Sequence, residues 1–160
     1  MERSCGGCTA CCKTHGIFEL QKIPGKWCPH CQVGNGCRIY SRRPQSCQVF
    51  RCMWLKGLGS PEHRPDKTGI VPEIKMIPGI AMAMIFYEFV EGSLNSEFTR
   101  KWTLNNLRVG NCVAHVHLRG NYTIYLSHKV SDPGLTYESD PPGKQVDIVT
   151  FPESVLRFLK

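Results

Sequence analysis

Cysteine is concentrated at the start of this chain. Nine of the ten cysteines fall within the first 52 residues, and only Cys112 lies beyond them. The nine are Cys5, Cys8, Cys11, Cys12, Cys28, Cys31, Cys37, Cys47 and Cys52. Cysteines this dense form disulfides in an oxidising compartment or bind metal as thiolates in a reducing one. The fold of the first third of the chain therefore depends on which of these two chemistries applies.

The start of the sequence favours the reducing alternative. Only four residues, Met1 to Ser4, precede the first cysteine, and they open no apolar stretch of the kind that a signal peptide requires. No segment approaches the roughly 18 to 20 consecutive apolar residues of a membrane-spanning helix. We therefore expect a cytoplasmic protein with no membrane partner, whose reduced thiols bind metal ions.

The positive charge of the chain lies among the same cysteines. Residues 1–56 hold nine Lys and Arg against two Glu, which accounts for the whole net charge of +7, and residues 57–160 hold eleven charges of each sign. Eight thiolates around two zinc ions would reduce the charge of the first segment to about +3. Nearby cations also lower thiol pKa values and donate hydrogen bonds to sulfur. The excess charge is thus expected to balance thiolates before it attracts nucleic acid.

The stretch CGGCTACC, residues 5–12, has the spacing of a metal-binding loop. Its glycines permit the tight turns that bring Cys5, Cys8 and Cys11 together. Consecutive side chains point in different directions, so we expect Cys11 and Cys12 to serve two neighbouring centres. The CxxCxxC spacing also opens the ferredoxin cluster motif, and therefore does not separate zinc from an iron–sulfur cluster.

The stretch CPHC, residues 28–31, has the composition of a reactive dithiol. Such dithiols are activated at the start of a helix. Here the residues after Cys31 are QVGNG, which would break the first turns of any helix. The sequence therefore favours a metal clamp, with His30 as an additional candidate ligand or a loop histidine.

The stretch from Cys37 to Cys52 supplies the last three sulfurs, at spacings of ten and five. Pro44 disfavours helical geometry at Arg43, so a helix is expected to begin after it and to run over residues 45–56. The spacing of five between Cys47 and Cys52 indicates different sites or a bend between them.

Together these motifs resemble a known family. The CxxCxxCC at residues 5–12, Cys28, the GCRIY at residues 36–40, the RPxxC at residues 43–47 and Cys52 are similar to the bacterial CxxCxxCC family of zinc- or iron-chelating proteins, often called YkgJ-like. The resemblance covers residues 5–52, about a third of the chain. It implies eight candidate ligands, which are Cys5, Cys8, Cys11, Cys12, Cys28, Cys37, Cys47 and Cys52. Cys31 departs from the pattern and is either an added ligand or a bystander.

The rest of the chain predicts a small α+β region. Residues 57–68 are expected to form a connecting loop with a solvated His63, residues 69–77 and 80–90 to form strands, and residues 93–110 to form a helix with Leu94, Phe98 and Trp102 on one face. A hairpin follows, with Cys112, Ala114, Val116 and Leu118 on one face and His115 and His117 on the other. A three-residue loop over residues 119–121 would pair Ile124 with Val116. Residues 131–144 are expected to form a loop, residues 145–150 a strand, and residues 152–160 a helix.

The histidine pair His115 and His117 is a weaker candidate metal site. Histidines two apart on a strand can chelate an ion, but no carboxylate or third ligand lies nearby in the sequence. A polar strand face is the simpler interpretation. Cys112 is expected to be a core cysteine.

We therefore expect one α+β fold with a cysteine-rich, metal-stabilised region over residues 1–56, docked on an antiparallel sheet with two or three helices over residues 57–160. Two closed zinc sites are favoured, because eight sulfurs divide into two sets of four. The first alternative is a [4Fe-4S] protein with a redox or enzymatic role, using Cys5, Cys8, Cys11 and one later cysteine. The second is a nucleic-acid-binding zinc module with Trp27, Tyr40, Phe50 and Trp54 as stacking groups. A dithiol oxidoreductase using Cys28 and Cys31 comes last. Metal ions are the expected partners, nucleic acid is not favoured, and the sequence does not identify a protein partner.

Overall fold

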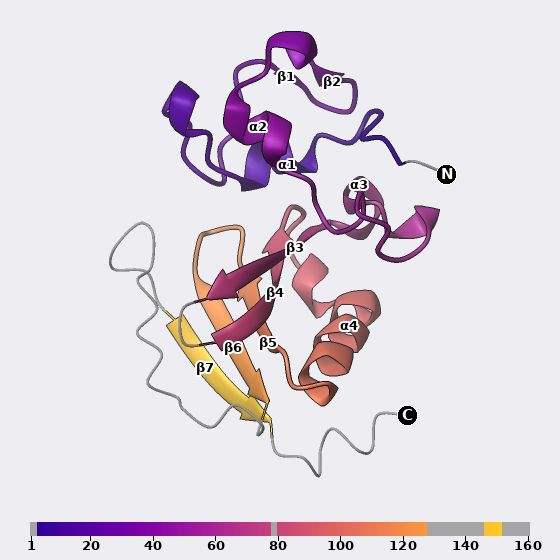
Figure 1. Ribbon diagram of the computed structural model, residues 1–160, viewed down its shortest axis with the longest axis vertical. Coiled ribbons are helices and arrows are strands. Elements are labelled where there is room, and N and C mark those ends of the chain that lie inside the picture. Colours follow the sequence, from indigo (N-terminus) through magenta and orange to yellow (C-terminus); the bar gives the residue numbers. More distant parts are fainter. Residues whose placement is uncertain (1–2, 78–79, 128–145, 152–160) are drawn as a thin grey trace.

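The computed structural model describes residues 3–77, 80–127 and 146–151. Its first part consists of short elements joined by turns, as Figure 1 shows in indigo and purple. They are α1 (Ala10–Thr14), η1 (Phe18–Leu20), β1 (Cys31–Gln32), β2 (Gly36–Cys37), η2 (Tyr40–Arg42), α2 (Gln45–Val49), η3 (Pro61–His63) and α3 (Pro65–Thr68). The second part contains a sheet and one longer helix. The α+β class is therefore confirmed.

The sheet has five strands in the order β3-β4-β5-β6-β7. Their bounds are β3 (Ile70–Ile77), β4 (Ile80–Glu88), β5 (Cys112–Val116), β6 (Tyr122–Ser127) and β7 (Val146–Phe151). The expected antiparallel sheet is only half correct, since β3–β4 and β5–β6 are antiparallel whereas β4–β5 and β6–β7 are parallel. The helix predicted between the second and third strands is the physical reason for the first parallel pair, because it carries the chain back across the sheet.

That helix, α4 (Glu97–Arg108), covers one face of the sheet (Figure 1). It starts at Ser96, whose hydroxyl accepts a hydrogen bond from the Thr99 amide, and the preceding turn η4 (Ser93–Asn95) buries Leu94. The core beneath it joins Ile70, Met84, Phe86, Leu94, Leu107 and Val113. Phe98 and Trp102 pack against this core as predicted. The helix is shorter than the predicted 93–110, and Leu94 reaches the same core from the turn before it.

The cysteine-rich part packs on the sheet through a second apolar cluster. Ala10, Cys52 and Trp54 are buried against Val71 of β3. Phe50 and Phe89 pack on the edge of this group. The Met53 amide also donates to the Pro72 carbonyl at 2.8 Å, which ties the end of the cysteine-rich stretch to an edge strand. Figure 1 shows this part at one end of the sheet.

Two local predictions are wrong. The helix expected over residues 45–56 ends at Val49, because Phe50 adopts an extended conformation and turns the chain toward the sheet. The prediction of a bend between Cys47 and Cys52 is therefore confirmed. The stretch 57–68 contains η3 and α3 rather than a plain loop, and His63 is half-buried, with its ring stacked on Phe98 at 4.5 Å.

The hairpin has a different register from the predicted one. Ile124 lies opposite Ala114, and Val116 lies opposite Tyr122. His117 and Asn121 close a loop over residues 118–120, in which Gly120 has a φ of 82°. The predicted apolar face is still formed, because Cys112, Ala114, Ile124 and Leu126 share one cluster. The predicted strand over 145–150 matches β7, while the predicted loop over 131–144 and helix over 152–160 lie outside the described residues.

Candidate metal centre

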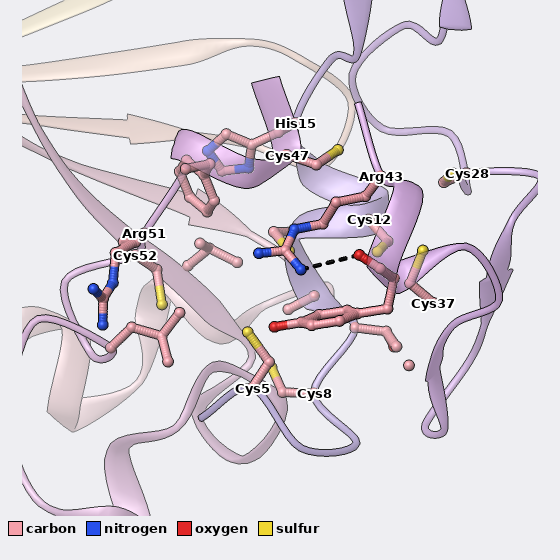
Figure 2. Close-up of a pocket in the computed structure, with 18 of the residues that line it drawn as sticks. Cys5, Cys8, Cys12, His15, Cys28, Cys37, Arg43, Cys47, Arg51 and Cys52 are labelled. Carbon is pink, nitrogen blue, oxygen red and sulfur yellow. Dashed lines mark hydrogen bonds between the residues drawn. The ribbon is translucent and has the colours of Figure 1, made fainter. Parts of the chain in front are cut away.

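One cavity of about 580 Å³ collects most of the predicted ligands. The cysteines that line it are Cys5, Cys8, Cys11, Cys12, Cys28, Cys37, Cys47 and Cys52. These are the eight that the family resemblance implies, and Cys31, which departs from that pattern, does not line the cavity. Figure 2 shows seven of them around the cavity. All ten cysteines of the chain are free thiols.

Close backbone contacts bring the cysteine-bearing segments together. The Cys8 amide donates to the Cys5 carbonyl at 2.9 Å, which forms the tight turn expected of CGGC. Gly7 then lies against the Gly34 carbonyl oxygen in the β1–β2 turn, so closely that a methyl group there would overlap it. The Cys28 amide donates to the Cys12 carbonyl at 3.0 Å. Segments 16 and 27 residues apart in the sequence are thereby held around one cavity.

Most of the thiols influence one another within two sets, although Cys12 of the second set also raises the pKa of Cys5 of the first. Burial raises the pKa of Cys8 to about 11, and Cys52 adds to that shift, while burial raises the pKa of Cys52 with a smaller contribution from Cys5. In the second set, burial raises the pKa of Cys47, and Cys12 and Cys28 raise it further. Figure 2 shows Cys5, Cys8 and Cys52 on one side of the cavity and Cys12, Cys28 and Cys37 on the other.

Two neighbouring thiols influence Cys12. The adjacent Cys11 thiol is the largest cause of the raised pKa of Cys12, followed by burial, whereas the Cys31 thiol lowers that pKa. The titration of Cys12 thus depends on both neighbouring thiols. Division of the pair between two centres stays a prediction.

The donor set suits zinc or an iron–sulfur cluster, because both take thiolate sulfur. No group of three or more Cys, His, Asp or Glu side chains within residues 3–77, 80–127 and 146–151 is arranged to hold one ion. The thiols line a cavity and do not converge on a single position within it. Ligation of a single ion would need these sulfurs to move closer together.

The charged residues that line the cavity are cationic, while Asp66 and Glu19 act on Cys8 and Cys47 from outside the lining. Arg3, Arg43 and Arg51 line the cavity, and no acidic residue is among the described residues that do so. Arg43 donates to the Tyr40 carbonyl at 3.2 Å and lies 4.0 Å from the centre of the Tyr40 ring. Burial raises the pKa of Cys5, and the charge of Arg43 opposes that shift. This is the arrangement expected of cations that stabilise thiolates.

Lys22 is a buried cation beside the second set of thiols. Its side chain is 8% exposed, and its Nζ donates to the carbonyls of Lys13 and His15. Burial lowers the pKa of Lys22, and nearby thiolates, Cys28 and Cys12 first, oppose that shift. Nothing in the sequence distinguished Lys22 from the exposed lysines.

His15 is a cavity residue that the sequence did not suggest. Its ring lies 4.2 Å from that of Phe50 and 4.4 Å from that of Tyr87. One ring nitrogen contacts the Thr14 hydroxyl at 2.8 Å and the other Glu73 Oε2 at 3.2 Å, so both nitrogens already have partners. Burial lowers the pKa of His15 despite Glu73. These contacts indicate that His15 has a structural role, in which it docks the cysteine-rich part on strands β3 and β4.

The other histidines among the described residues do not line the cavity. His30 is not among its lining residues. His115 is 5% exposed, and its Nε2 lies 2.8 Å from the Thr103 hydroxyl of α4. The interpretation of His115 and His117 as a polar strand face is therefore wrong for His115, because α4 covers that face.

The structure also bears on the two other sites that the sequence suggested, the dithiol at Cys28 and Cys31 and the aromatic groups for base stacking. After Cys28 and Cys31 the chain forms β1 and β2 instead of a helix, which agrees with the absence of dithiol activation. Trp54 is 7% exposed and its indole donates to the Ser60 carbonyl at 2.9 Å, so it is not available for base stacking. Trp27 and Tyr40 remain exposed at 38% and 55%.

Comparison of the chain with family models, with curated proteins and with solved structures finds no match in any of the three. A search of the described residues for a helix with the length and apolar character to cross a bilayer also finds none.

Proposed function

We propose that this chain is a metal-binding protein that holds two thiolate-ligated centres, with zinc as the metal, in its first 56 residues. The observation that carries the proposal is the single cavity lined by eight free thiols from widely separated segments. Eight sulfurs satisfy two tetrahedral zinc ions without an open coordination position. The resemblance to the CxxCxxCC family supports the same eight ligands.

The two sets of interacting thiols suggest how the ligands divide. Cys5, Cys8 and Cys52 would serve one ion, and Cys12, Cys28 and Cys47 the other, with Cys11 and Cys37 completing the sets. Metal binding would release protons from the buried thiols, whose pKa values are raised in the metal-free form. The cationic side chains would then balance the thiolate charge. Reduced thiols of this kind suit a reducing compartment such as the cytoplasm.

An iron–sulfur protein is the second candidate. The cavity, at about 580 Å³, falls within the range of small-molecule and cofactor pockets and is larger than two bare ions require. A cluster bound by Cys5, Cys8, Cys11 and a later cysteine would occupy more of it.

Elemental analysis and an absorption spectrum of protein purified without oxygen test the proposal. We expect two zinc per chain and a colourless sample. Iron and sulfide with a broad visible absorption band would establish the second candidate instead. A folded, metal-free protein with its thiols paired as disulfides would contradict both.

The ligand assignment has its own test. Cys8→Ser should release about one metal equivalent, since a closed site with three thiolates binds zinc weakly. Cys112→Ser is the matched control, because Cys112 is 1% exposed in the sheet core and does not line the cavity. An unchanged metal count in Cys8→Ser would remove Cys8 from the ligand set.

A further inference from the structure

The nine cations of the cysteine-rich part divide into two groups. Four of them lie at the cavity, since Arg3, Arg43 and Arg51 line it and Lys22 is buried beside the second set of thiols. Two zinc ions bound by eight thiolates carry a net charge of about −4, which these four cations offset. This balance rests on the proposed function.

The other five cations lie outside the balance, and they are Lys13, Lys26, Arg38, Arg42 and Lys56. All but Lys13 are exposed, and none of the four exposed ones forms an ion pair with a described residue. Glu19 is the one acidic residue between residues 3 and 56, and its carboxylate accepts hydrogen bonds from the Ser46 amide and hydroxyl at 2.8 and 2.7 Å. The outer surface of the cysteine-rich part therefore carries positive charge that the chain does not pair.

Tyr40 is an exposed aromatic ring among these cations. It is 55% exposed and lies in η2, between Arg38 and Arg42 in the sequence. The Arg43 guanidinium lies 4.0 Å from the centre of its ring and donates to the Tyr40 carbonyl at 3.2 Å, which fixes the turn. An exposed ring beside arginines is the arrangement that stacks a base and holds the neighbouring phosphates.

A second exposed ring, Trp27, belongs to a segment that is bonded to this turn. It is 38% exposed and follows the exposed Lys26. The Arg38 amide donates to the His30 carbonyl at 2.9 Å, which joins the start of the Tyr40 turn to the segment after Trp27. The cysteine-rich part thus presents two rings, each next to unpaired cations, on adjoining segments.

We propose that this surface binds single-stranded nucleic acid. Lys26, Arg38 and Arg42 contact phosphates. Tyr40 and Trp27 stack on bases. Exposed cations without partners attract a polyanion, and aromatic rings stack on any base, so the binding is not specific for sequence. An acidic protein would satisfy the cations, but the two rings favour a partner that has bases.

Fluorescence anisotropy of the full chain with a labelled single-stranded oligonucleotide of about 12 nucleotides tests the inference. We expect binding that weakens steeply as the salt concentration rises. Arg38→Gln combined with Arg42→Gln should weaken binding about tenfold and make the slope of log affinity against log salt shallower by about 1.4, because two phosphate contacts are lost. The matched control is Arg100→Gln combined with Lys101→Gln, which removes the same charge from exposed positions on α4. It should change the affinity by about twofold at most, because salt screens distant charges.

Tyr40→Leu separates stacking from charge. It should weaken binding about tenfold and leave the salt slope unchanged, because a base loses its stacking surface but no phosphate contact is removed. Wild-type affinity in Tyr40→Leu would overturn the inference. Displacement of the oligonucleotide by polyglutamate or by phosphatidylserine vesicles at equal charge concentration would also overturn it, since the surface would then be a general polyanion site.

Metal analysis of the same samples separates this inference from the proposed function. Two zinc per chain without oligonucleotide binding would refute the inference alone. Oligonucleotide binding by a folded protein that holds no metal would refute the proposed function alone.

Discussion

The buried ammonium of Lys22 should support the proposed metal centre although it is not a ligand itself. Its charge faces the Cys28 and Cys12 thiols, and two carbonyls hold its Nζ in place. We expect Lys22→Met to weaken metal binding about tenfold, because a neighbouring cation stabilises ligand thiolates. Competition with a chelator of known affinity measures the change. The control is Lys26→Met at an exposed position, and equal affinities in the two variants would exclude this role.

His115 should make the protein sensitive to acid. Burial, with a smaller contribution from His117, lowers the pKa of His115 to about 4, compared with about 6.5 in an unfolded chain. Between these values the unfolded state binds the proton and the folded state does not, so stability falls as the pH falls. The loss from pH 6.5 to 4 should reach about 3 kcal/mol.

Urea unfolding across this pH range measures the effect. The matched variant is His115→Gln, which keeps a hydrogen-bonding side chain next to Thr103 but does not titrate. We expect its unfolding free energy to depend less on pH than that of the wild type. Parallel pH profiles in the two proteins would mean that His115 is not responsible.

Among the elements, the contact between the CGGC turn and the β1–β2 hairpin is the most sensitive to size. A methyl group on Gly7 would overlap the Gly34 carbonyl oxygen, and that atom belongs to the backbone and cannot rotate away. We expect Gly7→Ala to destabilise the cysteine-rich part by about 1 to 3 kcal/mol, which is typical of overpacking. The nearest atom to a methyl group on Gly16 is 3.4 Å away, so Gly16→Ala is the control.

Thermal unfolding and metal content together measure this change. Gly7→Ala should lower both, whereas Gly16→Ala should change neither by much. If the two variants unfolded at the same temperature, the turn and the hairpin would not be in close contact in solution.

At the same scale, the elements that could be predicted are those whose pattern is local and periodic. The strands β3 and β4 and the helix α4 were recognisable because apolar residues recur at the period of each structure. The end of α2 was not, because Phe50 leaves the helix to pack on the sheet, and that contact is formed with residues distant in the sequence. The hairpin register depends on the position of the loop, in which Gly120 adopts a positive φ. The alternation of apolar residues is compatible with more than one loop length, so it does not fix the register.

The residues of the candidate site were also predictable only in part. The resemblance named the eight cysteines that line the cavity and set Cys31 apart, which is the division that the structure makes. Lys22 and His15 were not predictable, because their burial depends on segments that meet only in the folded chain. The burial of His115 likewise depends on α4 covering a strand face that its own sequence marks as polar.

For the whole molecule, the fold predicts that metal stabilises one part much more than the other. The sheet and α4 have their own core around Phe86 and Leu107, whereas the described elements of the cysteine-rich part are at most five residues long. Short elements of this kind are marginal without metal, and metal-binding energy becomes folding energy. A chelator should therefore unfold residues 5–52 while the sheet persists.

Hydrogen exchange with and without the chelator measures this difference. Amides such as those of Cys8, Cys12 and Cys28, which donate backbone hydrogen bonds, should lose their protection when metal is removed. Amides of β4 and β5 should keep theirs, because both strands are paired on each side within the sheet. Trp54 and Val71 lie where the two parts meet, so exchange near them should increase only in part. Simultaneous loss of protection in both parts would instead show a single cooperative unit, in which the sheet cannot stay folded without the metal-bound segment.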